Sequence, residues 1–198
     1  MPRRRRSALI GTGLLAVVLA ASGCSGDDGG SDDAPLGERP SLPTEAPALW
    51  NPCDGLDANA VEEAFDTSFD ESTGTDSAPE CTFRPSSGAA ENSPVVDVNY
   101  QLFAGSLAEM IGTFGEPTEG TSIEVTAPDV PQADDARLVV SIDEETLFVS
   151  GFVQNGQLVQ LVNVVDPGPF DRARDVAAVK QMLGDLAAHA AGSEVADD

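Results

Sequence analysis

Three apolar stretches follow one another between Ala136 and Val165, and they constrain the fold more than any other feature of the sequence. They read ARLVVSI, TLFVSGFV and LVQLVNVV, with the turns DEE and QNGQ between them. Short apolar segments rich in β-branched residues and bounded by turn residues are typical of strands. Asn155 followed by Gly156 is a strong signal for a hairpin with a two-residue loop. The run therefore predicts an antiparallel meander of three strands.

The chain before this meander alternates helical and strand patterns. Asp57 is a good capping residue, and the apolar spacing after it predicts a helix over 58–65. SPVVDVNYQLF alternates apolar and polar residues and predicts a strand with one solvated face. GSLAEMIGTFG contains a capping box of Ser106 and Glu109 and predicts a further helix.

The remaining patterns complete the order of elements. TSIEVTAP predicts a short strand, and FDRARDVAAVKQMLGDLAAHAAG predicts a long helix that Gly192 can end. This order of elements predicts an α+β fold. We expect an antiparallel β-sheet of about five to six strands with helices packed on one face, which makes a two-layer sandwich. We predict four segments: a signal peptide over 1–23, a disordered tether over 24–49, a single α+β domain over 50–192 and a frayed tail over 193–198.

Residues 1–24 have the three parts of an export signal. A basic start is followed by an apolar run from Ala8 to Ala21 and by small residues before Cys24. The run is short for a membrane span, which needs about 20 apolar residues. RRSAL is similar to a twin-arginine signal but departs from it, so general secretion is favoured.

This segment resembles the precursor of a bacterial lipoprotein. Such precursors place an aliphatic residue and two small residues directly before a cysteine, and Ala21, Ser22 and Gly23 hold those places here. Ala21 departs from the usual leucine. The resemblance implies that Cys24 is diacylated and anchors the protein on the extracytoplasmic face of the cell membrane, since two acyl chains give stable anchoring. Ordinary secretion, with Cys24 removed or free, is the alternative.

Acidic residues far outnumber basic ones. The chain has 34 aspartates and glutamates against 10 lysines and arginines, a net charge of -24. Such a surface repels phosphates, so we do not expect nucleic acid as a partner. The segment 25–49 is rich in glycine, serine, aspartate and proline without periodic apolar residues, which predicts a disordered tether.

The other two cysteines are Cys53 and Cys81. If Cys24 carries lipid, they form an even pair in an oxidising compartment, and such a pair suggests a disulfide. A redox pair or a metal site is the alternative. A redox pair usually has the C-x-x-C spacing, and zinc would need more ligands than two cysteines and the distant His189.

The lipobox (residues 21–24), the acidic tether and two short motifs together resemble a family of actinobacterial lipoproteins of unknown function. The first motif is Pro52, Cys53 and Asp54, and the second is CTF at 81–83, where Phe83 replaces the commoner tryptophan. The resemblance covers about residues 50–190. It implies location in the cell envelope and a Cys53–Cys81 disulfide, and it implies no catalytic residue.

No pattern in the sequence predicts a catalytic, metal-binding or cofactor-binding site. His189 is the only histidine, no G-x-S-x-G elbow is present, and no phosphate-binding loop occurs. The acidic residues 143–145 are interpreted as a solvated turn. Trp50, Tyr100 and Phe152 are candidates to line a ligand cleft, although such aromatics more often pack in a core.

We therefore expect a lipid-anchored binding or accessory module of the envelope, not an enzyme. Its partner is expected to be an envelope protein or a small lipophilic ligand. A deep apolar cavity would favour the small ligand, and a filled core would favour the protein. One alternative is a carboxylate-dependent hydrolase, which needs two carboxylates about 5–10 Å apart in one concave site, one of them with a raised pKa. The other is a passive surface or spacer lipoprotein.

Overall fold

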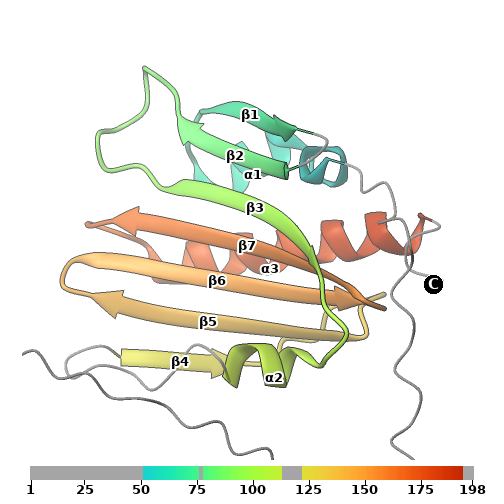
Figure 1. Ribbon diagram of the computed structural model, residues 1–198. Coiled ribbons are helices and arrows are strands. Elements are labelled where there is room, and N and C mark those ends of the chain that lie inside the picture. The colour runs from blue at the N-terminus through green and yellow to red at the C-terminus, as the bar shows by residue number, and fades with distance from the viewer. Residues whose placement is uncertain (1–50, 76–77, 113–121, 194–198) are drawn as a thin grey trace, which may run out of the picture. The chain divides into compact units, whose positions relative to one another are not determined.

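The computed structural model describes residues 51–75, 78–112 and 122–193 (Figure 1). The predicted signal peptide and tether lie outside these residues, as do Cys24, Trp50 and the last five residues of the predicted tail. In chain order the described elements are the 3-10 helix η1 (Pro52–Gly55), α1 (Ala58–Phe65), β1 (Phe69–Thr75), β2 (Ala78–Pro85), β3 (Val95–Leu102), α2 (Leu107–Gly112), β4 (Ser122–Thr126), β5 (Asp135–Asp143), β6 (Thr146–Asn155), β7 (Leu158–Pro167) and α3 (Arg172–Ala191).

Seven strands form one sheet in the order β1-β2-β3-β7-β6-β5-β4, and every neighbouring pair is antiparallel. The predicted α+β class and antiparallel sheet are confirmed, but the predicted number of five to six strands is wrong. The sequence carries no strand signal at β1, whose residues after Phe69 are all exposed. A strand with both faces in solvent has no alternation of apolar and polar residues, and that alternation is the signal used to predict strands.

The starts of α1 and α2 follow the capping chemistry expected from the sequence, and α3 is capped in the same way. The Asp57 side chain accepts hydrogen bonds from two backbone N–H groups at the start of α1, and Asp171 does the same for α3. The Glu109 carboxylate accepts from the Ser106 N–H at 2.8 Å, which completes the capping box of α2. Between β6 and β7, Gly156 has a φ of 57°, a conformation that favours glycine.

The helices cover both faces of the sheet. Val149 of β6 and Val162 of β7 pack in one core cluster with Val179 of α3. Phe152 and Val159 of the same strands belong to a second cluster with Leu107 and Met110 of α2. Because successive strand residues point to opposite faces, α2 covers the face opposite α3. The prediction that the helices pack on one face is therefore not confirmed, although Figure 1 shows the long α3 and the short α1 on the same face.

The main core lies between the sheet and α3. Its largest fully buried side chains include Phe65 of α1, Phe83 of β2 and Leu183 of α3, each 0% exposed. None of the described helices has the length and apolar content needed to cross a membrane.

Gly151 of β6 allows α3 to approach the sheet closely. A Cβ atom added there would lie 2.5 Å from Cγ1 of Val179 and 3.1 Å from Cδ1 of Leu183. A valine has few alternative rotamers, so the helix itself would have to move to admit a methyl group. A Cβ added at Gly184, within α3, would meet nothing within 4 Å.

We expect Gly151→Ala and Gly184→Ala to change stability in opposite directions. Gly151→Ala should lower the free energy of unfolding by about 1–3 kcal/mol, because overpacking displaces α3. Gly184→Ala should raise it by about 0.5–1 kcal/mol, because alanine costs less conformational entropy in a helix. Urea unfolding of both variants measures the difference, and equal effects would contradict the close approach at Gly151.

Candidate functional site

The structure brings together the two cysteines of the domain. Cys53 in η1 and Cys81 in β2 form a disulfide with an S–S distance of 2.08 Å. A carboxylate oxygen of Glu71 lies within 4.8 Å of both sulfur atoms, so the three residues have the geometry of a small ligand cluster. The sulfurs bond to each other, however, and only a thiolate ligates a metal or acts as a nucleophile. This disulfide therefore links η1 to the sheet and leaves no free thiolate at this position.

The predicted aromatic cleft is not formed by Tyr100 and Phe152. Tyr100 is half-buried and packs against the main core on the α3 face, whereas Phe152 is 2% exposed and packs under α2. Phe152 pairs with Leu161, which pairs with Asn99, the residue before Tyr100. The register therefore places the two aromatic side chains on opposite faces of the sheet. Trp50, the third candidate, lies outside the described residues.

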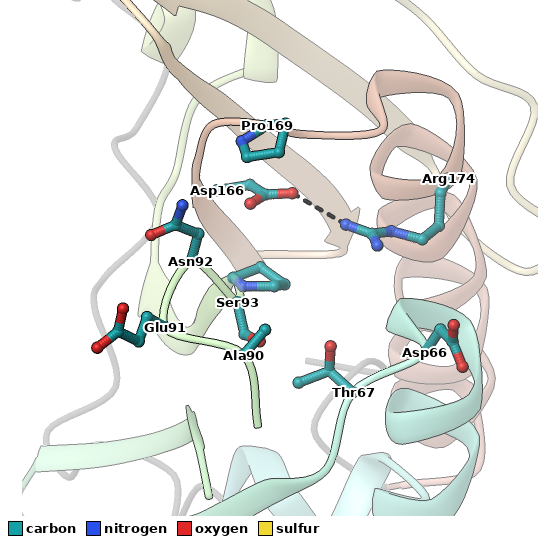
Figure 2. A pocket seen from close by; sticks show the side chains of 10 residues that line it. Asp66, Thr67, Ala90, Glu91, Asn92, Ser93, Asp166, Pro169 and Arg174 are labelled. Carbon is teal, nitrogen blue, oxygen red and sulfur yellow. Dashed lines mark hydrogen bonds and ion pairs between the residues drawn. The ribbon is translucent and has the colours of Figure 1, made fainter. Parts of the chain in front are cut away.

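A polar cleft of about 470 Å³ lies where the end of α1, the loop before β3, the end of β7 and the start of α3 meet (Figure 2). Its walls carry mainly short polar and acidic side chains: Asp66, Thr67, Glu91, Asn92, Ser93 and Asp166. The cis peptide bond between Gly168 and Pro169 lies at its border. Asn92 donates a hydrogen bond to the Gly168 carbonyl at 2.9 Å, which joins the loop before β3 to the segment after β7.

Arg174 connects two buried carboxylates at this cleft. Its Nη2 lies 2.9 Å from Oδ2 of Asp166, and its Nε donates to Oδ1 of Asp175 at 2.8 Å. The Asp166 side chain is 1% exposed and the Asp175 side chain 0% exposed, whereas Arg174 is 30% exposed. Two buried negative charges with one cation leave an excess charge, which is costly at low dielectric constant.

A proton bound to Asp166 would remove this excess charge. Oδ2 of Asp175 is buried and has no hydrogen-bond partner. Burial, together with a hydrogen bond to Asp175 and the charge of Asp175, raises the pKa of Asp166 to about 7, against the opposing effect of Arg174. When Asp166 is protonated, its hydroxyl can donate to Asp175 and satisfy the second carboxylate.

This pair shares one feature with the hydrolase alternative, the raised pKa of Asp166, but it is not open to a substrate. Both carboxylates contact the guanidinium group of Arg174, and their side chains are 1% and 0% exposed. The arrangement joins the end of β7 to the first turn of α3. The sequence alone does not indicate it, because Asp166 and Asp175 occur among many acidic residues and only the fold brings them together.

A second candidate site lies at the other edge of the sheet. β4 is an edge strand, and all five of its residues are exposed. Ile123 is 43% exposed and Val125 49% exposed, and both point to the face opposite α3, since Val125 pairs with Val139 of the second cluster. The β4 edge thus presents apolar side chains to solvent, unlike β1, which carries acidic ones.

On its α3 face, β4 borders an open groove of about 350 Å³. Leu138, Val140 and Val176 form its apolar floor, with Glu124 and Thr126 of β4 on one side and Arg172 and Lys180 of α3 on the other. Arg172 forms an ion pair with Glu124 across the groove. For Lys180, the only lysine of the chain, no ion pair is found within the described residues. We call this groove, together with the exposed face of β4, the β4 edge site.

We expect the proton held by Asp166 to make stability depend on pH. Its pKa is raised above the ordinary value of 3.8, so the folded state binds this proton more tightly than the unfolded chain. The stabilisation is fully present below about pH 4 and is lost as the pH rises to about 7. Asp175→Asn removes one charge and lets an amide N–H donate to Asp166. This variant should lose less stability than the parent between pH 4.5 and 8.

Urea unfolding of the parent and of Asp175→Asn at both pH values tests this expectation. At pH 8 the variant should be more stable by about 1–2 kcal/mol, since a buried unpaired carboxylate oxygen has been satisfied. Asp143→Asn, at an exposed turn, is the control and should keep the pH dependence of the parent. If the free energy of unfolding fell by the same amount between pH 4.5 and 8 in the parent and in Asp175→Asn, the result would contradict protonation of Asp166 in the folded state.

Comparison with known proteins assigns no family to this chain. No protein-family model matches it, and no curated protein matches it. The resemblance to actinobacterial lipoproteins stays a prediction from the motifs of the sequence.

Proposed function

We propose that the chain is a lipid-anchored module of the cell envelope that binds an extended segment of a partner protein along β4. The observation that carries this proposal is the exposed β4 edge, with Ile123 and Val125 uncovered on one face and a groove on the other. An extended peptide can add a strand to such an edge, where main-chain hydrogen bonds give affinity and alternate side chains give specificity.

The packing of the domain favours a protein partner over a lipophilic cargo. The two clefts described above are open to solvent, and the space between the sheet and α3 is filled by apolar side chains. A cargo site for a lipid needs an apolar cavity that encloses most of the ligand. Edge strands are ordinarily protected by charge or by a covering element, so the exposed apolar pair on β4 also favours an interaction.

The anchor is proposed from the sequence and agrees with the chemistry of the domain. Diacylation of Cys24 would hold an acidic protein at a membrane whose anionic surface its own charge repels. A disulfide such as Cys53–Cys81 persists in oxidising compartments, which is consistent with export. The proposed location is the extracytoplasmic face of the cell membrane.

We expect Cys24→Ala to release the protein from the membrane. Without the acylated cysteine only the acidic chain remains, and it does not adhere to anionic lipid. Fractionation of cells that express the full chain measures the distribution between membrane and medium. Cys81→Ala is the matched cysteine control and should leave the anchored fraction unchanged. A Cys24→Ala protein that stays in the membrane fraction would exclude lipid anchoring.

Photo-crosslinking in the native envelope tests partner binding at β4. A photoreactive residue at position 123 should form an adduct with one partner protein, and the same residue at position 73, on the opposite sheet edge β1, should not. Val125→Lys should reduce the adduct at least threefold, because a charge replaces an exposed apolar contact. Equal adducts at positions 123 and 73 would refute binding at the β4 edge.

A further inference from the structure

We propose that the half of the β4 groove formed by Lys180 and Thr126 binds a carboxylate side chain of the segment that pairs with β4. The partner is then an extended segment with apolar residues on one face and, on the other, one acidic residue facing Lys180 among uncharged polar residues. This inference rests on the proposed function and names the chemistry of the partner.

The two halves of the groove differ in whether their basic residue forms an ion pair. Arg172, Val176 and Lys180 are spaced four residues apart and lie on one side of α3. Glu124 and Thr126 are two residues apart on β4, so they share the face that borders α3. In one half, the charge of Arg172 is matched by Glu124. In the other half, the described lining residues include Lys180 and Thr126, and no carboxylate of the described part of the chain forms an ion pair with Lys180.

The charge of the domain makes this position selective. The chain has a net charge of -24, and Lys180 is its only lysine. Most of the surface repels an anionic group, so a single carboxylate is favoured only beside a cation whose charge is not already matched. The Thr126 hydroxyl can donate a second hydrogen bond to the same carboxylate.

The two faces of β4 determine the alternation. A strand added beside β4 places every second side chain on the groove face and the others beside Ile123 and Val125. Apolar side chains on that second face would cover these two residues, which are 43% and 49% exposed. One acidic residue facing Lys180, uncharged polar residues beside Glu124 and apolar residues on the other face therefore match both surfaces of the edge.

Peptide binding to the purified full-length chain tests this inference. The probes are capped seven-residue peptides in which valine alternates with threonine and the central threonine is replaced by glutamate, glutamine or lysine. We expect the glutamate peptide to bind about two- to fivefold more tightly than the glutamine peptide, the range given by an exposed ion pair. The lysine peptide reports the general attraction of a cation to the net charge of -24 and should lose no affinity in Lys180→Gln.

Variants of the groove locate the effect. Lys180→Gln should reduce the affinity for the glutamate peptide to that for the glutamine peptide. Thr126→Glu places a carboxylate of the chain itself beside Lys180 and should have the same effect on an intact fold, since position 126 is exposed. Ser122→Glu adds the same charge to the same face of β4, beyond Glu124, and is the matched control that should retain the preference for glutamate.

Each outcome decides between the inference and the proposed function. Equal binding of the glutamate and glutamine peptides, unchanged by Lys180→Gln but lost in Val125→Lys, would overturn the carboxylate site and leave β4 as the binding edge. Absence of binding by all three peptides, together with no adduct at position 123, would overturn both. Binding of dodecanoate that depends on Lys180, without peptide binding, would also overturn the inference and would assign the groove to an amphipathic small molecule.

Discussion

The packing of α3 against the centre of the sheet is the contact on which the rest of this domain depends. Gly151 lets Val179 approach β6, and the apolar residues of β6 and β7 form the floor beneath the helix. The α1 helix packs beside α3, and the disulfide attaches η1 to β2 on the same side. Because α3 is centred on β6 and β7, it does not extend over β4, and the groove at that edge is a direct result.

Much of the fold was predictable because its signals are local. The valine-rich stretches of β5, β6 and β7 and the caps at Asp57 and Asp171 are formed by residues close together in the chain. The β1 strand was not predicted, since its exposed residues carry no apolar alternation. Which face of the sheet each helix covers could be predicted only from the strand register, and short-range sequence patterns do not give that register.

The candidate sites were harder to predict, because they too depend on which distant segments the fold brings together. Cys53 and Cys81 were predicted to pair because they form an even pair in a chain with an export signal, and the family resemblance implied the same disulfide. Asp166 and Asp175 are two acidic residues among 34, so nothing in the sequence distinguished them before the fold joined them through Arg174. Tyr100 and Phe152 were grouped as aromatics, and the antiparallel register separated them. Three basic residues of the domain, Arg172, Arg174 and Lys180, all lie on α3. Arg174 contacts two buried carboxylates, whereas Lys180 is exposed to solvent.

The position of the disulfide has a mechanical consequence for the N-terminal anchoring proposed above. A pulling force applied to the chain before Asn51 would pass from Cys53 directly to Cys81 through the covalent bond. It would therefore reach the sheet at β2, an inner strand with β1 and β3 on either side. The 27 residues between the two cysteines, which follow from a sequence separation of 28, include α1 and β1. These elements lie outside the shorter covalent path, so α1 would be protected from unravelling under load.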